Sequence, residues 1–234
     1  MGMKILGIDT STKTGSVAVV NENGLVVQYT LSIEVTHSER LMTTLDRVLK
    51  DAGLSLDEIH GYAVSIGPGS FTGLRVGIST VKGLAFATGR PIAAVPTLEA
   101  MAWNIPFCGH AVCPMLDAKK REVYAGIYRF EGPALVCEMD AAAVSLPALF
   151  TKIRGTAVFV GEAAMSYRAE IEEALSGRAL FAPLSHSSPS AGSVAGIGLR
   201  MIEQGVVSDL DALAPMYIRR PEAEVQWEKR RISS

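Results

Sequence analysis

The chain has 234 residues, of which 48% are hydrophobic and 20% are charged, and its mean hydropathy is +0.25. A chain of this length and composition can bury a large core, which argues against intrinsic disorder. With 22 Lys and Arg against 24 Asp and Glu, the net charge is −2, so no global positive field gathers nucleic acid, and any RNA contact has to be local or shared with a partner.

The cysteines and the apolar segments predict a cytoplasmic protein without a membrane contact. Cys108, Cys113 and Cys137 form no CxxC pair, which favours a reducing compartment. The N-terminal MGMKILGID lacks the features of a secretory signal. The longest apolar region, residues 83–95, contains an Arg-Pro pair and is shorter than the about 20 residues that a membrane span needs.

The first half of the chain alternates apolar runs with turn signals. Strand-like runs at 4–9, 15–20 and 25–31 predict a three-stranded meander, whose second turn is Asn23-Gly24. The patterns that follow predict a helix over 38–52, a strand at 62–66, the glycine-rich turn GPGSFTG, a helix over 74–88 and a strand at 91–95.

The second half begins in the same way, with apolar runs at 111–116, 123–128 and 134–137. Asp9 precedes Gly24 by fifteen residues, and Asp117 precedes Gly132 by fifteen. A strand at 158–160 and a helix over 165–175 follow. The match is weak residue by residue, so coincidence stays open, but it predicts a duplicated βββαβα unit. This is the α/β, actin-like (ASKHA, ribonuclease H-like) architecture of two subdomains facing a cleft.

This interpretation divides the chain into three parts. Residues 1–104 form a first actin-like subdomain, and residues 105–190 form a second, degenerate one. A helix of small residues at 191–204 follows a polar linker and is expected to return to the first subdomain, and residues 205–234 form a C-terminal extension.

Two turns of small and hydroxyl residues follow strands, where α/β folds bind ligands. Backbone N–H groups in such turns, together with a helix N-terminus, suit an anion. The turns match neither a Walker loop nor GxGxxG, so purely structural turns remain an equal alternative. We expect no tightly bound cofactor and at most weak binding of ATP or ADP. The candidate phosphate-loop residues are Asp9, Thr10, Ser11, Gly67, Gly69, Ser70 and Thr72.

No catalytic set accompanies these turns. Residues 65–79 contain no acidic residue, so the second carboxylate of an actin-like kinase is missing. The four histidines lack metal-ligand spacing, and GxSxG is absent. We therefore expect no catalytic residue and no metal ion.

The helix expected near residues 73–89 has only Arg75 and Lys82 as charges, so it needs cover on two faces. A wholly internal helix and a partner interface both remain open. The small residues that would let a second helix approach are Gly73, Gly77, Ser79, Gly83 and Ala87.

The role of two basic segments also remains open. The first is Lys119, Lys120 and Arg121, and the second is the C-terminal tail. Both either face solvent or contact the phosphates of an RNA. The arginines of the tail are Arg219, Arg220, Arg230 and Arg231.

Five segments resemble the bacterial TsaB family, formerly YeaZ. They are GIDTSTKTGSVAV, HSERL, GPGSFTGLRVGISTVKGLAFATGRPIAAVPTLEA, MLDAKKREVYAGIY and PMYIRR. The similarity is dense from residue 4 to about residue 130 and thinner beyond. The resemblance implies an actin-like fold and a non-catalytic subunit of the machinery that makes threonylcarbamoyladenosine at position 37 of tRNAs reading codons that begin with A.

The family has a catalytic paralogue, TsaD, which carries two metal-binding histidines in the segment equivalent to VPTLEAM. Here those positions are Thr97 and Met101, neither of which replaces an imidazole. The resemblance thus implies a scaffold without the metal site and argues against a glycoprotease-like metalloenzyme. A stand-alone actin-like ATPase or kinase and a purely structural dimer remain alternatives.

The resemblance also implies that the chain pairs with TsaD through the helices at 38–52 and 72–88, with the ATPase TsaE as third member and tRNA reached through the complex. Without TsaD, the same surface is expected to form a homodimer. The expected contact residues are Leu41, Leu45, Leu74, Arg75, Val76, Ile78 and Val81.

Overall fold

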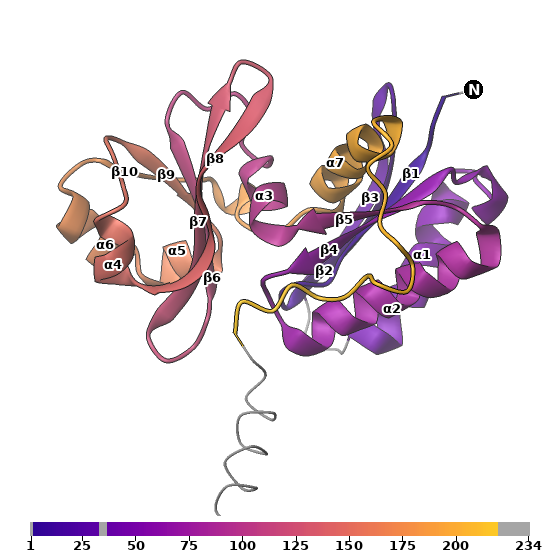
Figure 1. Ribbon diagram of the computed structural model, residues 1–234, viewed down its shortest axis with the longest axis horizontal. Helices are drawn as coiled ribbons and strands as arrows, with labels where there is room; N and C mark the ends of the chain where they lie inside the picture. The colour runs from indigo at the N-terminus through magenta and orange to yellow at the C-terminus, as the bar shows by residue number, and fades with distance from the viewer. Residues whose placement is uncertain (1, 33–36, 220–234) are drawn as a thin grey trace, which may run out of the picture.

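The computed structural model describes residues 2–32 and 37–219 and places them in two five-stranded sheets (Figure 1). The first sheet has the strand order β3-β2-β1-β4-β5, in which β1 pairs antiparallel with β2 and parallel with β4. Its strands are β1 (Ile5–Asp9), β2 (Thr14–Asn21), β3 (Gly24–Ser32), β4 (Gly61–Gly67) and β5 (Ile92–Pro96).

The second sheet repeats this topology with the order β10-β9-β6-β7-β8. Its central strand β6 pairs antiparallel with β7 and parallel with β9, as β1 does with β2 and β4. The predicted duplication of a βββαβα unit, and with it the two-subdomain actin-like fold, is confirmed. The strands are β6 (Ala111–Asp117), β7 (Glu122–Glu131), β8 (Ala134–Ser145), β9 (Ala157–Val160) and β10 (Ala179–Phe181).

Helices cover both faces of the first sheet. Successive residues of a strand point to opposite faces, so Leu6 of β1 packs under α1 (His37–Asp51) and α2 (Phe71–Thr88), whereas Ile5 packs under α7 (Ala191–Glu203). The small residues of α7 allow a close approach: a Cβ on Gly198 would lie 2.3 Å from the Cβ of Ala63. Figure 1 shows α7 on one side of the sheet and α1 with α2 on the other.

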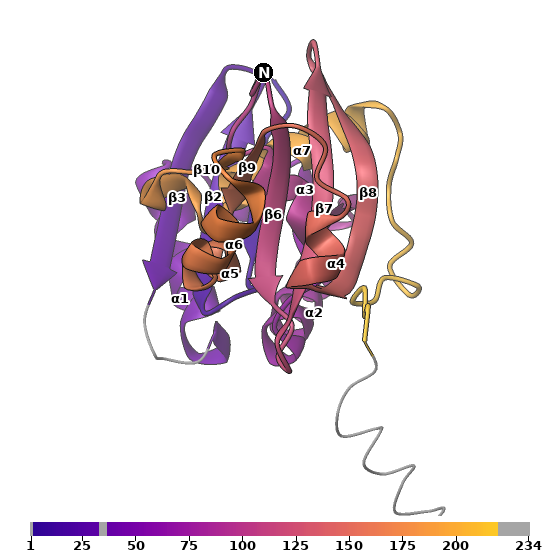
Figure 2. The ribbon, with the colours of Figure 1, turned by 90° about the vertical axis from the view of Figure 1, so that its left-hand side faces the viewer.

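The second sheet is covered on its outer face by three short helices, α4 (Leu146–Phe150), α5 (Glu162–Ser166) and α6 (Arg168–Leu175), as Figure 2 shows. The short helix α3 (Thr97–Ala102) packs on its other face, between the two sheets (Figure 1). Two 3₁₀ turns, Leu56–Glu58 and Leu184–His186, complete the regular elements of the described residues.

The second half differs from the prediction at β8 and at the helix expected over 165–175, and it contains two elements, α4 and β10, that the patterns did not predict. Strand β8 runs on to Ser145 because it stays paired with β7, although its alanines and acidic residues do not favour a strand. The expected helix at 165–175 is two helices that meet at Tyr167, whose φ of −106° and ψ of 18° are not helical.

After α7, residues 205–219, here called the C-terminal strap, run along the first half to the second (Figure 1). The Ser208 N–H donates to the carbonyl of Ile92, and the Met216 N–H donates to the carbonyl of Ile66, both at 2.7 Å. Residues 220–234, and with them Arg220, Arg230 and Arg231, lie outside the described residues. None of the helices in residues 2–32 and 37–219 has the length and hydropathy needed to cross a membrane.

Candidate functional site

The first predicted phosphate loop follows β1 and is built around the buried carboxylate of Asp9. One oxygen accepts hydrogen bonds from the backbone N–H and the hydroxyl of Ser11, at 3.0 and 2.9 Å. The other oxygen accepts a hydrogen bond from the hydroxyl of Ser65 on β4. The carboxyl group therefore ties the ends of two neighbouring strands together, and both of its buried oxygens have hydrogen-bond partners.

The second loop, after β4, packs directly on the first. The Ser70 N–H donates to the carbonyl of Ser11 at 2.6 Å, and a Cβ on Gly69 would lie 2.3 Å from the same oxygen. The hydroxyl of Thr10 donates to the carbonyl of Gly73 at 2.7 Å, whereas Thr72 is exposed. The predicted loop residues thus come together, but the N–H groups of Ser11 and Ser70 bind protein oxygens.

The C-terminal strap lies against this pair of loops. A Cβ on Gly67 would lie 2.7 Å from the carbonyl oxygen of Met216, and the ring of Tyr217 stacks on Phe71 with centroids 4.3 Å apart. The Arg75 Nε donates to the hydroxyl of Tyr217 at 2.9 Å. Sequence reasoning missed these interactions, although the PMYIRR segment that carries Met216 and Tyr217 was one of the five matching segments.

The two positions that hold histidines in TsaD-like sequences do not fit a metal ion here. Thr97 is buried, and its hydroxyl accepts a hydrogen bond from the Gly67 N–H at 3.2 Å. Met101 is buried in the apolar cluster between α3 and the second sheet. Within the part of the chain that the structure describes, no group of three or more His, Cys, Asp or Glu side chains is placed to hold a metal ion.

Most of the side chains expected to contact a partner lie inside the first half instead. Four of them are at most 6% exposed and pack in the core between the helices and the sheet: Leu41, Leu45, Ile78 and Val81. Leu74 is buried against the loop at Gly67. Val76 is half-buried against the same core, and only Arg75 is exposed. This corrects the prediction, because the apolar stripe of each helix covers the sheet, which offers the larger apolar surface.

The small residues of α2 also divide into a buried group and an exposed group. Gly73 and Gly77 are buried, and a Cβ on Gly77 would lie 2.4 Å from the hydroxyl of Thr10, so these two glycines do not face a second helix. The exposed side, here called the outer face of α2, consists of Arg75, Ser79, Gly83, Phe86 and Ala87.

The outer face of α2 carries one large exposed apolar side chain beside small residues. The ring of Phe86 is 82% exposed, and no atom lies within 4 Å of a Cβ built on Gly83. On the neighbouring helix α1, Met42 is 54% exposed. A large exposed aromatic residue beside small residues is typical of a surface that another molecule covers.

The turn between β6 and β7 holds the basic residues Lys119, Lys120 and Arg121, here called the basic hairpin turn. All three are exposed and have positive φ angles of 64°, 55° and 58°. The left-handed conformation costs about 1–2 kcal/mol for a residue other than glycine. The turn is nevertheless closed by backbone bonds: the Ala118 N–H donates to the carbonyl of Glu122, and the Glu122 N–H to that of Lys119, both at 3.0 Å.

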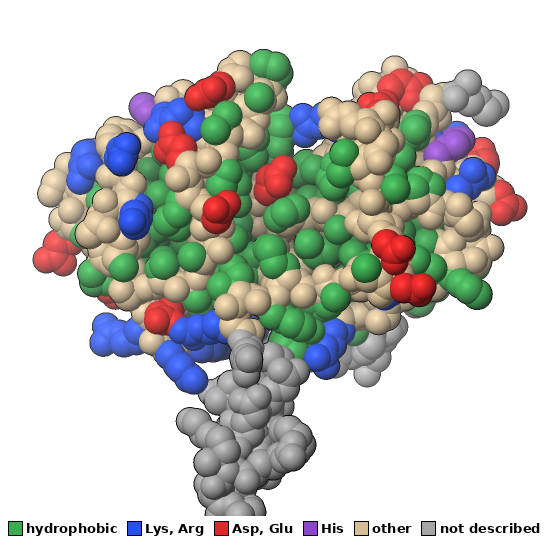
Figure 3. All heavy atoms as spheres, in the orientation of Figure 1, with side chains coloured by type: hydrophobic (Ala, Val, Ile, Leu, Met, Phe, Trp, Pro, Cys, Tyr) green, Lys and Arg blue, Asp and Glu red, His purple; other side chains and the backbone are tan. Residues whose placement is uncertain are grey.

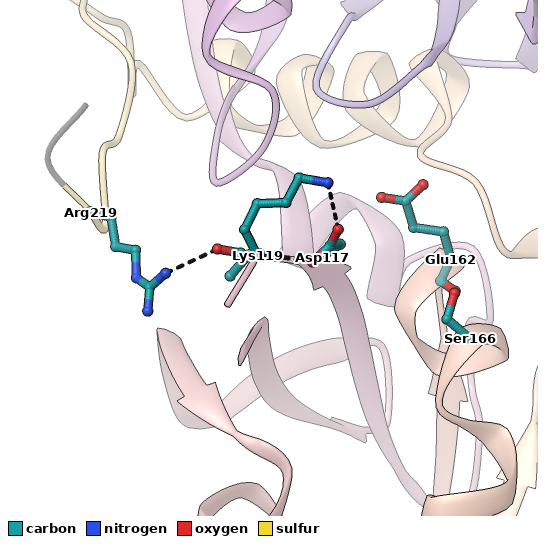
Figure 4. A network of polar contacts seen from close by, with 6 residues as sticks. Asp117, Lys119, Glu162, Ser166 and Arg219 are labelled. Carbon is teal, nitrogen blue, oxygen red and sulfur yellow. Dashed lines mark hydrogen bonds and ion pairs between the residues drawn. The ribbon is translucent and has the colours of Figure 1, made fainter. Parts of the chain in front are cut away.

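Charged side chains surround the base of this turn (Figure 4). The carboxylate of Asp117 accepts hydrogen bonds from the backbone N–H and the ammonium of Lys119, each at 2.7 Å. Partial burial raises the pKa of Asp117, but these bonds outweigh it and lower the pKa overall; the same hydrogen bond raises the pKa of Lys119. The Arg219 guanidinium donates to the Ala118 carbonyl at 3.0 Å and pairs with the Glu122 carboxylate.

Comparisons with known proteins agree with this architecture. Residues 32–227 match the family described as "TsaD: tRNA N6-adenosine threonylcarbamoyltransferase". The chain is 28% identical over 228 residues to the "tRNA threonylcarbamoyladenosine biosynthesis protein TsaB" of Bacillus subtilis, covering 96% of this chain and 98% of that protein.

Among solved structures, "YeaZ from Pseudomonas aeruginosa" is similar with a TM-score of 0.74 and 28% identity, over 92% of this chain and 99% of that one. The ROK hexokinase of Thermus thermophilus shares the fold alone, with a TM-score of 0.51 and 13% identity, over 87% of this chain and 100% of that one. The chain therefore belongs to the family whose model is described as TsaD, and within it to the TsaB, or YeaZ, branch.

Proposed function

We propose that the chain is a non-catalytic subunit of the bacterial machinery that forms threonylcarbamoyladenosine at position 37 of tRNAs reading codons that begin with A. In this role it binds and supports a TsaD-type transferase, with the ATPase TsaE as third member. Membership of the TsaB branch and the name of the Bacillus subtilis relative support the pathway. The observation that carries the non-catalytic role is the burial of Thr97 and Met101, where the transferase has imidazoles.

The proposed partner surface is the outer face of α2 with the adjoining side of α1. The exposed Phe86 ring offers the large apolar contact that often dominates binding, and the small residues Gly83 and Ala87 let a partner helix approach closely. Because this face exposes the Phe86 ring, we propose that it pairs two copies of the chain when the transferase is absent. The homodimer and the complex with TsaD would then use the same surface, so one chain could not form both at once.

A matched pair of substitutions tests the surface. Ala87→Arg places a long cation on the outer face of α2, and Ala174→Arg does the same on the exposed side of α6 in the second half. We expect Ala87→Arg to weaken binding to TsaD by about 2 kcal/mol or more, because it buries a charge and blocks close approach. Co-elution of the Ala87→Arg variant with TsaD, with an affinity equal to that of Ala174→Arg, would contradict the surface.

Phe86→Ala tests the same surface without a new charge. Loss of a central aromatic contact typically costs about 2 kcal/mol or more, so we expect a similar weakening in a titration against TsaD. The isolated variant should unfold as the unchanged protein does, since a ring that is 82% exposed contributes little to the core. An unchanged affinity would contradict the assignment.

For the loops at the ends of β1 and β4, we propose at most weak binding of ATP or ADP. The bonds from the N–H groups of Ser11 and Ser70 to protein oxygens support this, because those donors are then not available to a phosphate. Titration calorimetry with ATP and ADP tests it. ATP turnover that Asp9→Ala abolishes would favour a stand-alone actin-like ATPase or kinase, and one equivalent of bound zinc or iron would favour a glycoprotease-like metalloenzyme.

A further inference from the structure

We propose that the basic hairpin turn, Lys119–Lys120–Arg121, binds the phosphate backbone of the tRNA. The identity of the RNA rests on the proposed function, whereas the site itself rests on the geometry and charge of the turn. The three side chains are exposed at the end of a hairpin whose strands β6 and β7 belong to the core of the second half. The turn therefore presents its cations from a rigid base.

The backbone of the turn argues that the side chains have a role of their own. Three consecutive residues hold a left-handed conformation that glycine or asparagine would adopt with less strain. Local strain of this kind is typical of functional positions, where the side chain is needed more than the easiest turn. The bonds between Ala118, Lys119 and Glu122 hold the strained turn in one shape.

The charges around the turn add up to a local positive surface. Lys119 lies near the carboxylates of Asp117 and Glu162, and Arg219 pairs with that of Glu122. The side chains of Lys120 and Arg121 are exposed at the tip. Four cations thus lie among three carboxylates, which leaves a local excess of positive charge on a chain whose overall charge is −2. Figure 3 shows basic side chains gathered along the edge of the molecule beneath β6 and β7. Such a patch can hold an RNA backbone even though the whole chain lacks a positive field.

The strap fixes the turn beside the N-terminal end of α2, where the outer face of this helix begins with Arg75. Tyr217 stacks on Phe71 at the start of α2, and Arg219, two residues later, binds the base of the turn. Two residues of extended chain span at most about 7 Å, so the turn lies close to the N-terminal end of α2. A tRNA held by a transferase that extends past this end of α2 would meet Lys120 and Arg121, and the proposal requires that arrangement.

A charge-reversed variant and a matched control test the proposal. Lys120→Glu/Arg121→Glu reverses the charge at the tip and leaves Lys119 in place, because the Lys119 ammonium donates to the Asp117 carboxylate at the base of the turn. Lys152→Glu/Arg154→Glu makes the same charge change at an exposed site after α4. Each variant is assembled with TsaD, and the affinity of the complex for an unmodified tRNA transcript is measured by fluorescence anisotropy over a series of salt concentrations.

We expect the hairpin variant to weaken tRNA binding by about tenfold or more. The slope of log K against log salt concentration should become shallower by about 1–2, which is roughly one unit for each phosphate that the variant no longer neutralises. The control should stay within about twofold of the unchanged complex. Both variants should bind TsaD normally and unfold at the same temperature as the unchanged chain. Equal tRNA affinity of the two variants would overturn the proposal.

Two further outcomes separate this proposal from the proposed function. Loss of TsaD binding by the hairpin variant alone would mean that the turn binds an acidic protein surface, which also overturns the RNA assignment. If the unchanged chain itself does not bind TsaD, the proposed function fails, and the turn is judged on binding of tRNA by the isolated chain at low salt. In that measurement, weaker tRNA binding by the hairpin variant than by the control supports the proposal. Equal tRNA binding by the two variants overturns it.

Discussion

The hydroxyl of Thr97, at the start of α3, accepts a hydrogen bond from the backbone N–H of Gly67, at the end of β4, at 3.2 Å. Both groups are buried, so this bond replaces water for a donor that has no other access to it. A position that holds an imidazole in TsaD-like sequences therefore serves here to fix the glycine loop to the helix that packs between the two sheets.

Replacing Thr97 by Val keeps the shape of the side chain and removes the acceptor. We expect the free energy of unfolding to fall by about 1–3 kcal/mol, because the Gly67 N–H would be left buried without a partner. Thr97→Ser keeps the hydroxyl, so its free energy of unfolding should fall by less. Urea unfolding of the two variants measures the difference, and equal stabilities would show that the bond contributes nothing.

Gly69 and Gly83 form a second matched pair. A Cβ on Gly69 would lie 2.3 Å from the carbonyl oxygen of Ser11, whereas one on Gly83 meets no atom within 4 Å. We expect Gly69→Ala to destabilise the fold by about 1–3 kcal/mol, because the two loops must separate. Gly83→Ala should stabilise it by about 0.5–1 kcal/mol, because alanine favours the helix. Thermal unfolding checks both, and a stable Gly69→Ala variant would contradict the close packing of the loops.

Tyr217 provides a test of the strap. Tyr217→Ala removes the stacking on Phe71 and the bond from Arg75, and should cost about 1–2 kcal/mol of unfolding free energy. Tyr217→Phe keeps the stacking, so its loss of unfolding free energy should be less than half of the loss in Tyr217→Ala. Hydrogen exchange of the Met216 N–H, which bonds to Ile66, should become faster in the alanine variant. Unchanged exchange there would show that the strap is held by other interactions.

Glu99 on α3 gives the fold a pH dependence. Burial raises the pKa of this half-buried carboxyl, and the positive charge of Arg200 offsets part of the effect. A carboxyl whose pKa is raised in the folded state contributes its full stability while it is protonated in both states, and this contribution is lost as the pH rises through the folded pKa.

Glu99→Gln should therefore match the unchanged protein below the ordinary pKa of a glutamate and become the more stable of the two above the raised value. Urea unfolding over a pH series measures both curves. The gap between them should open across that window and then stay constant. Curves that run parallel from acid to neutral pH would contradict the raised pKa.

Local patterns predicted most of the strands and the duplication. Apolar runs that end at Asp9 and Asp117 became β1 and β6, the central strands of the two sheets, because a fully buried strand is continuously apolar and ends where polar residues return. The length of strand β8 was underestimated, because its second part is held by pairing with β7 rather than favoured by its own residues.

The candidate site was predicted less well, for two physical reasons. An apolar stripe on a helix shows that something covers it, but not what, so Leu45 and Val81 were assigned to a partner although they face the sheet. The exposed Phe86 lies outside that stripe and leaves no periodic signal. Interactions between distant segments, such as Phe71 with Tyr217, have no local pattern at all.

The most direct test of the account is threonylcarbamoyl transfer to a tRNA from preformed threonylcarbamoyl-adenylate. It compares this chain alone, TsaD with TsaE, and all three proteins together. For the proposed non-catalytic subunit, modification is expected only in the complete mixture, because Thr97 and Met101 leave this chain without imidazoles at those positions. Transfer by this chain alone, or equal transfer with and without it, would contradict a required non-catalytic subunit.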